Sequence, residues 1–403
     1  MRSSPSLHSL ANCIEIGGVR SFCTFIAILL CLTPAISLAD PDDSVPEEHT
    51  VSTDLPVEAI PDLTEESSRF KFLSKKPDNL LLVPIPTSSP TFGTGLILGG
   101  AYFYPQTEEQ KNAQPASFTG AAAGYTDQES WFAGVMQQNY WSEDRWRFTG
   151  VAGYLDLKLE LRSPDEEDGG TRPVDWLLDG AFIQTRLSRK IRGDWYLGLT
   201  ASYLDITQVI DLNFEDDRFN LQSDITAAGI GLNLEFDSRD LPSNPYSGRH
   251  FEIKAMTSDQ SNTDAGSYQS YHARLRSYHS LSDPLVLAWD INGCTKSGRI
   301  PLWDTCRLAL RGFPATDYLS RQSVYAQAEI RWRFYKRLGM VAFAGAGHID
   351  DSFGAQGESE TIPSYGAGIR LMLLESQRIN LRIDYARSDN GSDAWYLSVT
   401  EAF

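Results

Sequence analysis

Apolar and polar residues alternate along most of the chain from about residue 80 onward. Between Ser323 and Phe334 the even-numbered positions are apolar, whereas the odd-numbered ones include Glu329, Arg331 and Arg333. The same period of two recurs in residues 229–237 and 379–385. This period is that of a β-strand with one apolar and one polar face. The pattern therefore predicts an all-β region.

The length of the predicted strands favours a membrane barrel over a soluble sandwich. Strands of soluble sandwiches have about 5–6 residues, whereas strands that cross a membrane need about 9–11. The polar face also carries full charges, such as Glu329 and Arg331, that a dry core would not accept unpaired. Aromatic residues near strand ends are typical of the two membrane interfaces. Ten or more residues make up each of the segments 130–141, 146–161, 195–210, 223–237, 268–281 and 378–387.

The segments add up to a transmembrane antiparallel β-barrel of about 16 strands, because single-chain bacterial barrels have an even number. Segment 304–310 is either a strand or part of a long loop. In the second case Leu80–Pro86 supplies the first strand, although its two prolines weaken that assignment. The candidate strands are 91–105, 116–126, 130–141, 146–161, 174–188, 195–210, 223–237, 248–258, 267–281, 285–293, 304–310, 322–334, 339–349, 363–374, 378–387 and 393–403.

The first 78 residues contain two segments that precede the barrel. Arg2 and Arg20 come before an apolar run at 22–32, and Ser37-Leu38-Ala39 has the small residues of a cleavage site. Residues 1–39 are therefore predicted to be a signal peptide, since the run is shorter than the ~20 residues of a membrane-spanning helix. Residues 40–78 are predicted to be a disordered acidic periplasmic segment, because 40–68 has ten carboxylates and no Lys or Arg. The barrel then occupies residues 79–403.

Composition removes several classes of function. The formal net charge is −18, which argues against nucleic acid because phosphate binding requires clustered Lys and Arg. Of the five cysteines, three fall in the predicted signal peptide, and Cys294 and Cys306 remain. A pair of cysteines in an exported protein predicts one disulfide.

No motif indicates catalysis. Ser270, His272, His279 and Ser280 lie on one predicted strand, but we interpret them as polar residues facing the lumen rather than as a nucleophile with its base. No G-x-S-x-G sequence occurs, and the acidic cluster 165–168 lacks the spacing of a calcium loop. The sequence therefore predicts a protein that is not an enzyme and has no cofactor and no bound metal.

Four stretches, in order, resemble the bacterial surface antigen superfamily, which includes the barrels of outer-membrane assembly factors and two-partner-secretion transporters. They cover roughly the last 180 residues. The stretches are 231–240 with Pro245 and Gly248, Leu310-Arg311-Gly312-Phe313, Ala328-Glu329-Ile330-Arg331 with 343–347, and 366–370 with 381–386 and Phe403.

The resemblance assigns roles to individual residues. Arg311, Gly312 and Phe313 are expected to form a loop lock, in which the Arg311 guanidinium enters the lumen and meets Glu329. Gly345 stands where the family usually has an aspartate, so a single carboxylate partner is expected. Asp237, Arg239, Asp240 and Gly248 resemble the family's turn motif. Phe403 is expected to be the C-terminal assembly signal.

The resemblance also implies a function at the outer membrane of a Gram-negative bacterium. No helical periodicity in 40–78 matches a polypeptide-transport repeat, so a barrel-only member is expected. It would assist insertion or translocation of proteins, or of lipid, through a lateral seam and a sixth loop inserted in the lumen. The alternative is a passive channel or structural barrel. Expected partners are outer-membrane lipid and lipopolysaccharide, the barrel assembly machinery that inserts the chain, and unfolded outer-membrane protein clients.

Overall fold

The computed structural model describes residues 79–164, 171–213, 218–242, 244–261, 266–352, 359–375, 378–388 and 391–403. The predicted signal peptide, 1–39, and the predicted acidic segment, 40–78, lie outside these residues and stay predictions. The acidic cluster 165–168 lies outside them as well. Among the described residues, no helix is both long enough and apolar enough to cross a membrane.

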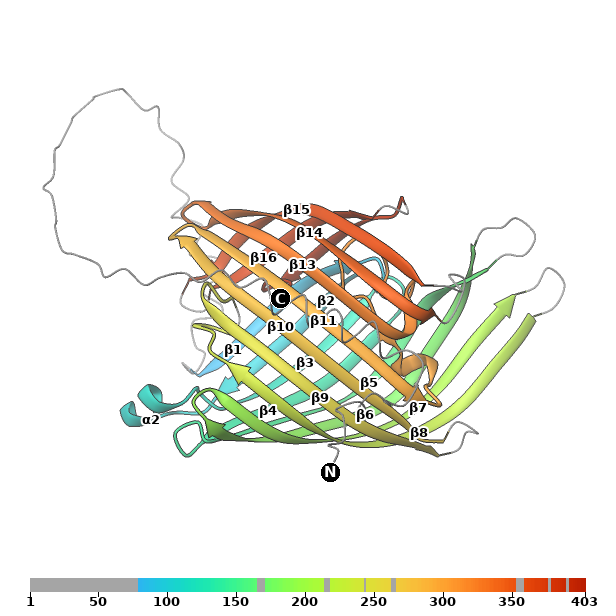
Figure 1. The fold of residues 1–403 in the computed structure, drawn as a ribbon, viewed down its shortest axis with the longest axis horizontal. Helices are drawn as coiled ribbons and strands as arrows, with labels where there is room; N and C mark the ends of the chain where they lie inside the picture. Colours follow the sequence, from blue (N-terminus) through green and yellow to red (C-terminus); the bar gives the residue numbers. More distant parts are fainter. Residues whose placement is uncertain are drawn as a thin grey trace, which may run out of the picture. The chain divides into compact units, whose positions relative to one another are not determined.

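The described residues form one antiparallel sheet of 17 strands (Figure 1). Sixteen of these strands make the wall of a closed barrel, while the two-residue β12 belongs to a loop, so the predicted fold class is confirmed. The strands are β1 (Leu80–Ser89), β2 (Gly93–Phe103), β3 (Phe118–Thr126), β4 (Trp131–Trp141), β5 (Trp146–Pro164), β6 (Thr171–Arg192), β7 (Trp195–Asn213), β8 (Arg218–Asp237), β9 (Gly248–Ser261), β10 (Tyr268–Ser282), β11 (Leu285–Gly298), β12 (Cys306–Arg307), β13 (Leu319–Tyr335), β14 (Leu338–Ser352), β15 (Glu360–Leu374), β16 (Ile379–Ser388) and β17 (Asp393–Val399).

The two faces of the wall are inverted relative to a soluble protein. On β13 the apolar Ile330 and Trp332 are 48% and 46% exposed, whereas Glu329, on the opposite face of the same strand, is 1% exposed. The apolar residues of this alternating strand therefore point outward and the charged ones point into the lumen. A lipid-facing outer surface accounts for this arrangement, because apolar side chains gain nothing from facing water.

The first strand and the loop before β13 settle the strand count. Leu80–Ser89 is β1, which pairs along its whole length with β2. Segment 304–310 is not a wall strand, because β12 covers only two of its residues and pairs with β13 inside a longer loop. Candidate segment 91–105 contains β2 and the turn that precedes it.

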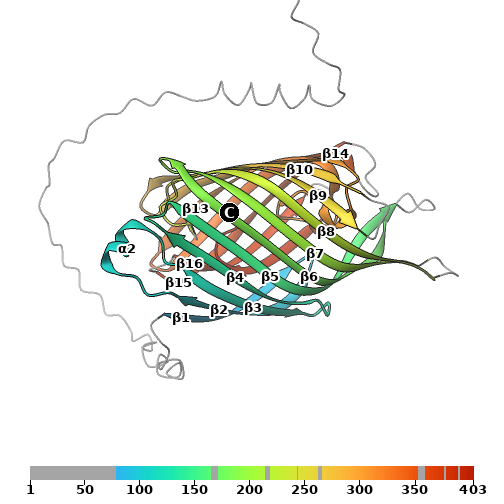
Figure 2. The same ribbon diagram turned by 90° about the horizontal axis from the view of Figure 1, so that it is seen from below.

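The connections differ at the two ends of the barrel. Short turns join β4 to β5 and β13 to β14 at one end, which also holds helix α2 (Glu108–Ala113). At the opposite end the hairpins β5–β6 and β7–β8 extend past the neighbouring strands, as Figures 1 and 2 show at the right. These strands have 19–22 residues, against 9–11 for β2–β4. We call the two ends the turn end and the hairpin end.

Candidate functional site in the barrel lumen

The loop between β11 and β13, residues 299–318, starts at the hairpin end and enters the lumen. A disulfide joins Cys294 of β11 to Cys306, with their Cα atoms 5.7 Å apart. The short helix η2 (Leu302–Asp304) lies between the two cysteines in the sequence. Tyr268 of β10 donates a hydrogen bond from its hydroxyl to the Asp304 carboxylate at 2.6 Å. The outer part of the loop is thus fastened to β10 and β11.

Apolar packing holds the inner part of the loop against the wall. Leu308, Leu310, Phe313 and Tyr318 are buried together with one inward residue from each of three wall strands, Tyr325, Ile349 and Ile362. The Phe313 and Tyr318 rings meet edge to face, with centroids 4.7 Å apart. Burying these side chains removes apolar surface from water, which is the main stabilising contribution to the position of the loop.

The Arg311 guanidinium bridges two carboxylates on different strands. Its Nη2 donates to Oε2 of Glu329 on β13 at 2.8 Å, and its Nη1 donates to Oδ2 of Asp384 on β16 at 2.8 Å. Both acids are completely buried at their side chains. The guanidinium carbon also lies 3.4 Å from the centroid of the Phe343 ring. Arg311 therefore fixes the loop to β13, β14 and β16 with directional contacts.

Additional arginines surround the same carboxylates. Arg331 donates to Glu329 at 2.6 Å, and Arg370 donates to Asp384 at 2.6 Å. Arg370 also pairs with Glu401 at 2.7 Å. The cluster, which we call the lumen charge cluster, consists of Arg311, Arg331, Arg370, Arg382, Glu329, Asp384 and Glu401. Four guanidinium groups thus face three carboxylates.

The main chain around Arg311 requires a glycine. Gly312 has φ +123°, and a Cβ there would lie 3.2 Å from the main-chain carbon of Arg387. Its N–H donates to the hydroxyl of Tyr396 on β17 at 2.8 Å, and the hydroxyl of Ser364 donates to the Arg311 carbonyl. Gly312 therefore allows the loop to approach β15, β16 and β17 closely.

The structure places Arg311 beside Glu329, but the expectation of one carboxylate partner is wrong. Asp384 is the second acid. A Cβ at Gly345 would lie 2.7 Å from the Gln327 side chain, so this position has no room for an aspartate without a shift. The alternating pattern had already placed Asp384 on the polar face of its strand. The pattern makes Asp384 one of several inward acids, and the register between strands selects it as the partner of Arg311.

The residues of the turn motif lie at the turn end, between β8 and β9. Both oxygens of Asp237 accept hydrogen bonds from Arg239, at 2.8 and 2.9 Å. Gly248 has φ +102°, and a Cβ there would lie only 2.2 Å from the Ser238 carbonyl oxygen. The Asp237–Arg239 pair and Gly248 thus define how the chain leaves one strand and enters the next.

Asp240 ties this turn to the turn between β15 and β16. Its Oδ1 accepts hydrogen bonds from the N–H groups of Tyr246 and Ser247 at 3.0 and 3.3 Å, and Arg378 donates to Oδ2 at 2.5 Å. Burial acts to raise the pKa of Asp240, but the hydrogen bonds from Arg378 and from the two N–H groups outweigh it. The pKa of this carboxyl therefore lies below its ordinary value.

The same turn reaches the lumen charge cluster. Asn244 donates to the carbonyl of Arg378 at 2.9 Å and accepts a 3.4 Å hydrogen bond from Arg331. In the wall, β9 and β16 are separated by β10, β11, β13, β14 and β15. Residues 238–242 and 244–247 therefore extend across part of the turn end of the barrel.

Phe403 lies inside the barrel rather than on its outer face. Strand β17 ends at Val399, and Thr400 has φ +77°. Phe403 then packs against Tyr278 and Ala288, and its main-chain oxygen accepts a hydrogen bond from Arg331 at 2.8 Å. Its role as a C-terminal assembly signal stays a prediction.

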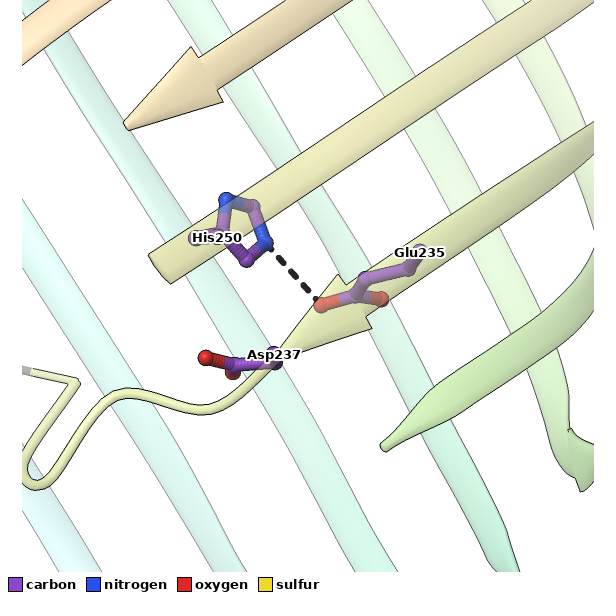
Figure 3. Close-up of side chains that lie close together, drawn as sticks. All are labelled: Glu235, Asp237 and His250. Atoms are coloured by element: carbon purple, nitrogen blue, oxygen red, sulfur yellow. Dashed lines mark hydrogen bonds and ion pairs between the residues drawn. The ribbon is translucent and has the colours of Figure 1, made fainter. Parts of the chain in front are cut away.

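Glu235, Asp237 and His250 form the one group in the described residues whose donor atoms lie close enough to share a metal ion, within 4.8 Å of one another (Figure 3). His250 Nε2 lies 3.1 Å from the Glu235 carboxylate, and Arg186 lies 3.9 Å from it. Arg239 occupies both oxygens of Asp237, as described above. These contacts already occupy the carboxylate oxygens, so the group is explained as a network of hydrogen bonds and ion pairs.

Comparison with known proteins places the fold but not the family. No protein-family model matches the sequence, and no curated protein matches it. The fold is shared with BamA from Haemophilus ducreyi lacking POTRA domains 1-3, at 11% identity and a TM-score of 0.54, over 81% of this chain and 71% of that one. CdiB from Escherichia coli is 12% identical with a TM-score of 0.54, over 81% of this chain and 63% of that one. CdiB from Acinetobacter baumannii is 12% identical with a TM-score of 0.52, over 80% of this chain and 60% of that one.

The chain therefore spans less than two thirds of the two CdiB chains. At these identities the likeness shows a common barrel fold. The class of protein defined so far is a closed antiparallel β-barrel of 16 wall strands, built like the barrels of BamA and CdiB.

Proposed function

We propose that this protein is a Gram-negative outer-membrane barrel of the bacterial surface antigen superfamily that assists insertion or translocation of proteins, or of lipid, through a lateral seam. Its partners would be outer-membrane lipid and lipopolysaccharide, unfolded outer-membrane protein clients and the barrel assembly machinery that inserts it. The proposal involves no catalytic step, no cofactor and no nucleic acid.

The observation that carries the proposal is the weak junction between β1 and β17. The two strands are paired in register at one position, Ser88 with Leu397, whereas β1 pairs with β2 along all 10 of its residues. Pro84 and Pro86 have no N–H to offer to either neighbour. Unpaired main-chain groups at such an edge are a template for an incoming strand.

The anchored loop supports the same function. Arg311 joins the loop to β13 and β16, and Gly312 joins it to β17 through Tyr396. The loop thus holds the inner side of the wall next to the seam while the seam itself is weakly paired. A simple channel gains nothing from an arginine buried this deeply, because desolvating its charge is costly.

A reversible cross-link at the seam tests the proposal. Ser88→Cys with Leu397→Cys would join the two opposed positions. The matched control, Ala121→Cys with Val135→Cys, joins β3 to β4 at an outward pair that is already in register. In cells that depend on the variant, we expect folded outer-membrane barrel proteins, or outer-membrane lipid composition, to change only for the oxidised seam variant and to recover on reduction.

The charged lumen favours a second candidate, a passive channel. Sixteen strands enclose a lumen wide enough for water. Unchanged barrel-protein and lipid levels in cells depleted of the protein, together with a stable ion conductance in planar bilayers, would favour the channel and reject the proposal. Heat-modifiable migration on gels would show that each variant barrel is folded.

A further inference from the structure

The middle of strands β1–β5 is apolar on both of its faces. On β2, Leu98 points outward and is 61% exposed, while its neighbour Ile97 points inward and pairs with Ile85 of β1. On β4, Val135 points outward and Met136 points inward. The lumen of a membrane barrel is ordinarily polar, so an apolar inner face needs a separate explanation.

Seven side chains of this inner face, which we call the apolar wall, lie outside the apolar clusters that the loop joins in the described residues. Its side chains are half-buried, and none of them belongs to a buried cluster of the described residues. The loop packs instead on β13, β14 and β15, and through Leu302 and Trp303 on the inner apolar cluster of β5–β8 at the hairpin end. An apolar surface left open to a water-filled lumen is unfavourable and marks a binding site. The apolar wall consists of Val83, Ile85, Ile97, Phe118, Phe132, Met136 and Val151.

The opposite side of the lumen carries an excess of positive charge. In a wall of 16 strands, β10 is eight strands from β2, and Figure 2 shows β1–β3 on one side and β9 and β10 on the other. Lys254 of β9 has no ion pair among the described residues. Arg274 and Arg276 of β10 share one carboxylate, Asp290, at 2.7 and 3.6 Å. Nε of Arg276 has no hydrogen-bond partner in the described part of the chain.

We propose that the lumen binds an anionic amphiphile, with its acyl chain on the apolar wall and its acidic head group near Lys254 and Arg276. An acyl chain would remove the apolar wall from water, and the head group would compensate the excess charge. A purely polar solute would leave the apolar wall exposed to water. The weak seam borders the apolar wall through β1, so the chain of the ligand would have a short path to the membrane.

This inference rests on the proposed function only because the ligand would leave the lumen through the same seam. The experiment measures binding and requires no transport. The probe is 1-palmitoyl-lysophosphatidylglycerol carrying a diazirine at the chain end, added to the full barrel in amphipol. Each inward position has an outward neighbour one residue away, which provides an internal control. We expect photolabelling at Ile97 and Met136 in excess of Leu98 and Val135, read by peptide mass spectrometry.

Two substitutions test the head-group side. Lys254→Gln is expected to weaken binding of the same lysolipid about tenfold in native mass spectrometry. Lys158→Gln is the matched control, because this exposed lysine pairs with Glu129 outside the lumen and its loss should leave binding unchanged. Lysophosphatidylcholine, with no net charge, and glycerol 3-phosphate, with no chain, should both bind at least tenfold more weakly.

Three outcomes would overturn the inference. One is labelling confined to the outward residues, which would indicate only the lipid belt. Another is equal binding of the anionic and zwitterionic lysolipids. The last is labelling of Ile97 and Met136 by an amphipathic diazirine peptide but not by the lysolipid, which would assign the apolar wall to polypeptide. Any of these results would leave the seam test of protein insertion intact.

Discussion

The residues of the lumen charge cluster differ in how much the loss of each would lower the stability of the barrel. The four guanidinium groups face three carboxylates, and all three acids are nearly or completely buried at their side chains. A buried charge without a counter-charge is strongly destabilising, whereas removal of a surplus charge of the same sign is tolerated better. The acids should therefore matter more for stability than Arg311 does.

Asp384→Asn tests this imbalance. It leaves four guanidinium groups facing two carboxylates, so we expect the free energy of unfolding to fall by about 3 kcal/mol. Arg311→Met leaves three guanidinium groups facing three carboxylates and should lower the free energy of unfolding by less. The double variant should lower it by less than the sum of the two single variants. Urea unfolding in micelles, followed by tryptophan fluorescence, measures all three.

The control for this cycle is the exposed pair Lys158–Glu129, where Lys158→Met and Glu129→Gln should show no coupling. The same cycle on Arg311→Ala and Glu329→Ala should also show coupling. Strictly additive effects within the cluster would mean that Arg311 does not lock the loop.

At the residue scale the sequence predicts the contact of Arg311 with Glu329 but not its contact with Asp384. Parity on an alternating strand is a local property, so it placed Glu329 on the inward face with Arg331. Which inward acid of another strand meets Arg311 depends on the register between β13, β14, β15 and β16, which no local pattern contains. Asp384 was missed for that reason.

Elements of the barrel form two fastenings, at opposite ends of the lumen. The disulfide Cys294–Cys306 fixes the loop near the hairpin end. The β8–β9 turn connects Asp240, Asn244 and Arg378 at the turn end. Arg331 contacts both Glu329 and Asn244, so the turn-end fastening is joined to the lumen charge cluster.

The lowered pKa of Asp240 makes the turn-end fastening dependent on pH. Because the folded state depresses this pKa, the carboxylate contributes stability above its unfolded pKa of about 3.9, and that contribution is lost as the pH falls through the lower folded value. We expect hydrogen exchange in residues 238–242 and 244–247 to accelerate relative to the wall as the pH falls below about 4, after correction for intrinsic rates.

Asp240→Asn is the matched variant, because it keeps an acceptor for the N–H groups but loses the charge that pairs with Arg378. Its turn should exchange at a corrected rate that does not change between pH 7 and pH 3. A turn in the unsubstituted protein that stays equally protected at both pH values would contradict this assignment.

Strand prediction succeeds where alternation is long and fails at the ends of the barrel. The long strands were expected from the period of two alone. Leu80–Ser89 was harder, because Pro84 and Pro86 argue against a strand in the middle of a sheet. They are tolerated in β1 because one of its edges is almost unpaired. Segment 304–310 has strand-like residues but is held by the loop packing, which is a tertiary contact.

Across the whole molecule, pairing between strands is uneven. β7 pairs with β8 along all 19 of its residues, whereas β17 pairs with β16 at each of its 7 residues and with β1 at one position. The lumen is uneven in the same way, with an apolar wall on β1–β5 and charge on the opposite side. Neither property follows from the composition of the chain, because both depend on which strands become neighbours on closure.

This uneven pairing predicts where the barrel opens first. Local opening draws on the regions with the fewest hydrogen-bonded contacts, so the seam should open at a lower free energy than any other junction. We expect the amides of β1 and β17 that face each other to exchange much faster than those of β7 and β8, while the amides of β1 that face β2 stay protected. Hydrogen exchange with residue-level mass spectrometry resolves these sets. The oxidised Ser88→Cys, Leu397→Cys variant should slow only the seam amides, and the oxidised Ala121→Cys, Val135→Cys variant should leave them fast. Uniform protection around the wall would show that β1 and β17 are joined as firmly as the other strands, and the lateral seam would then have no physical basis.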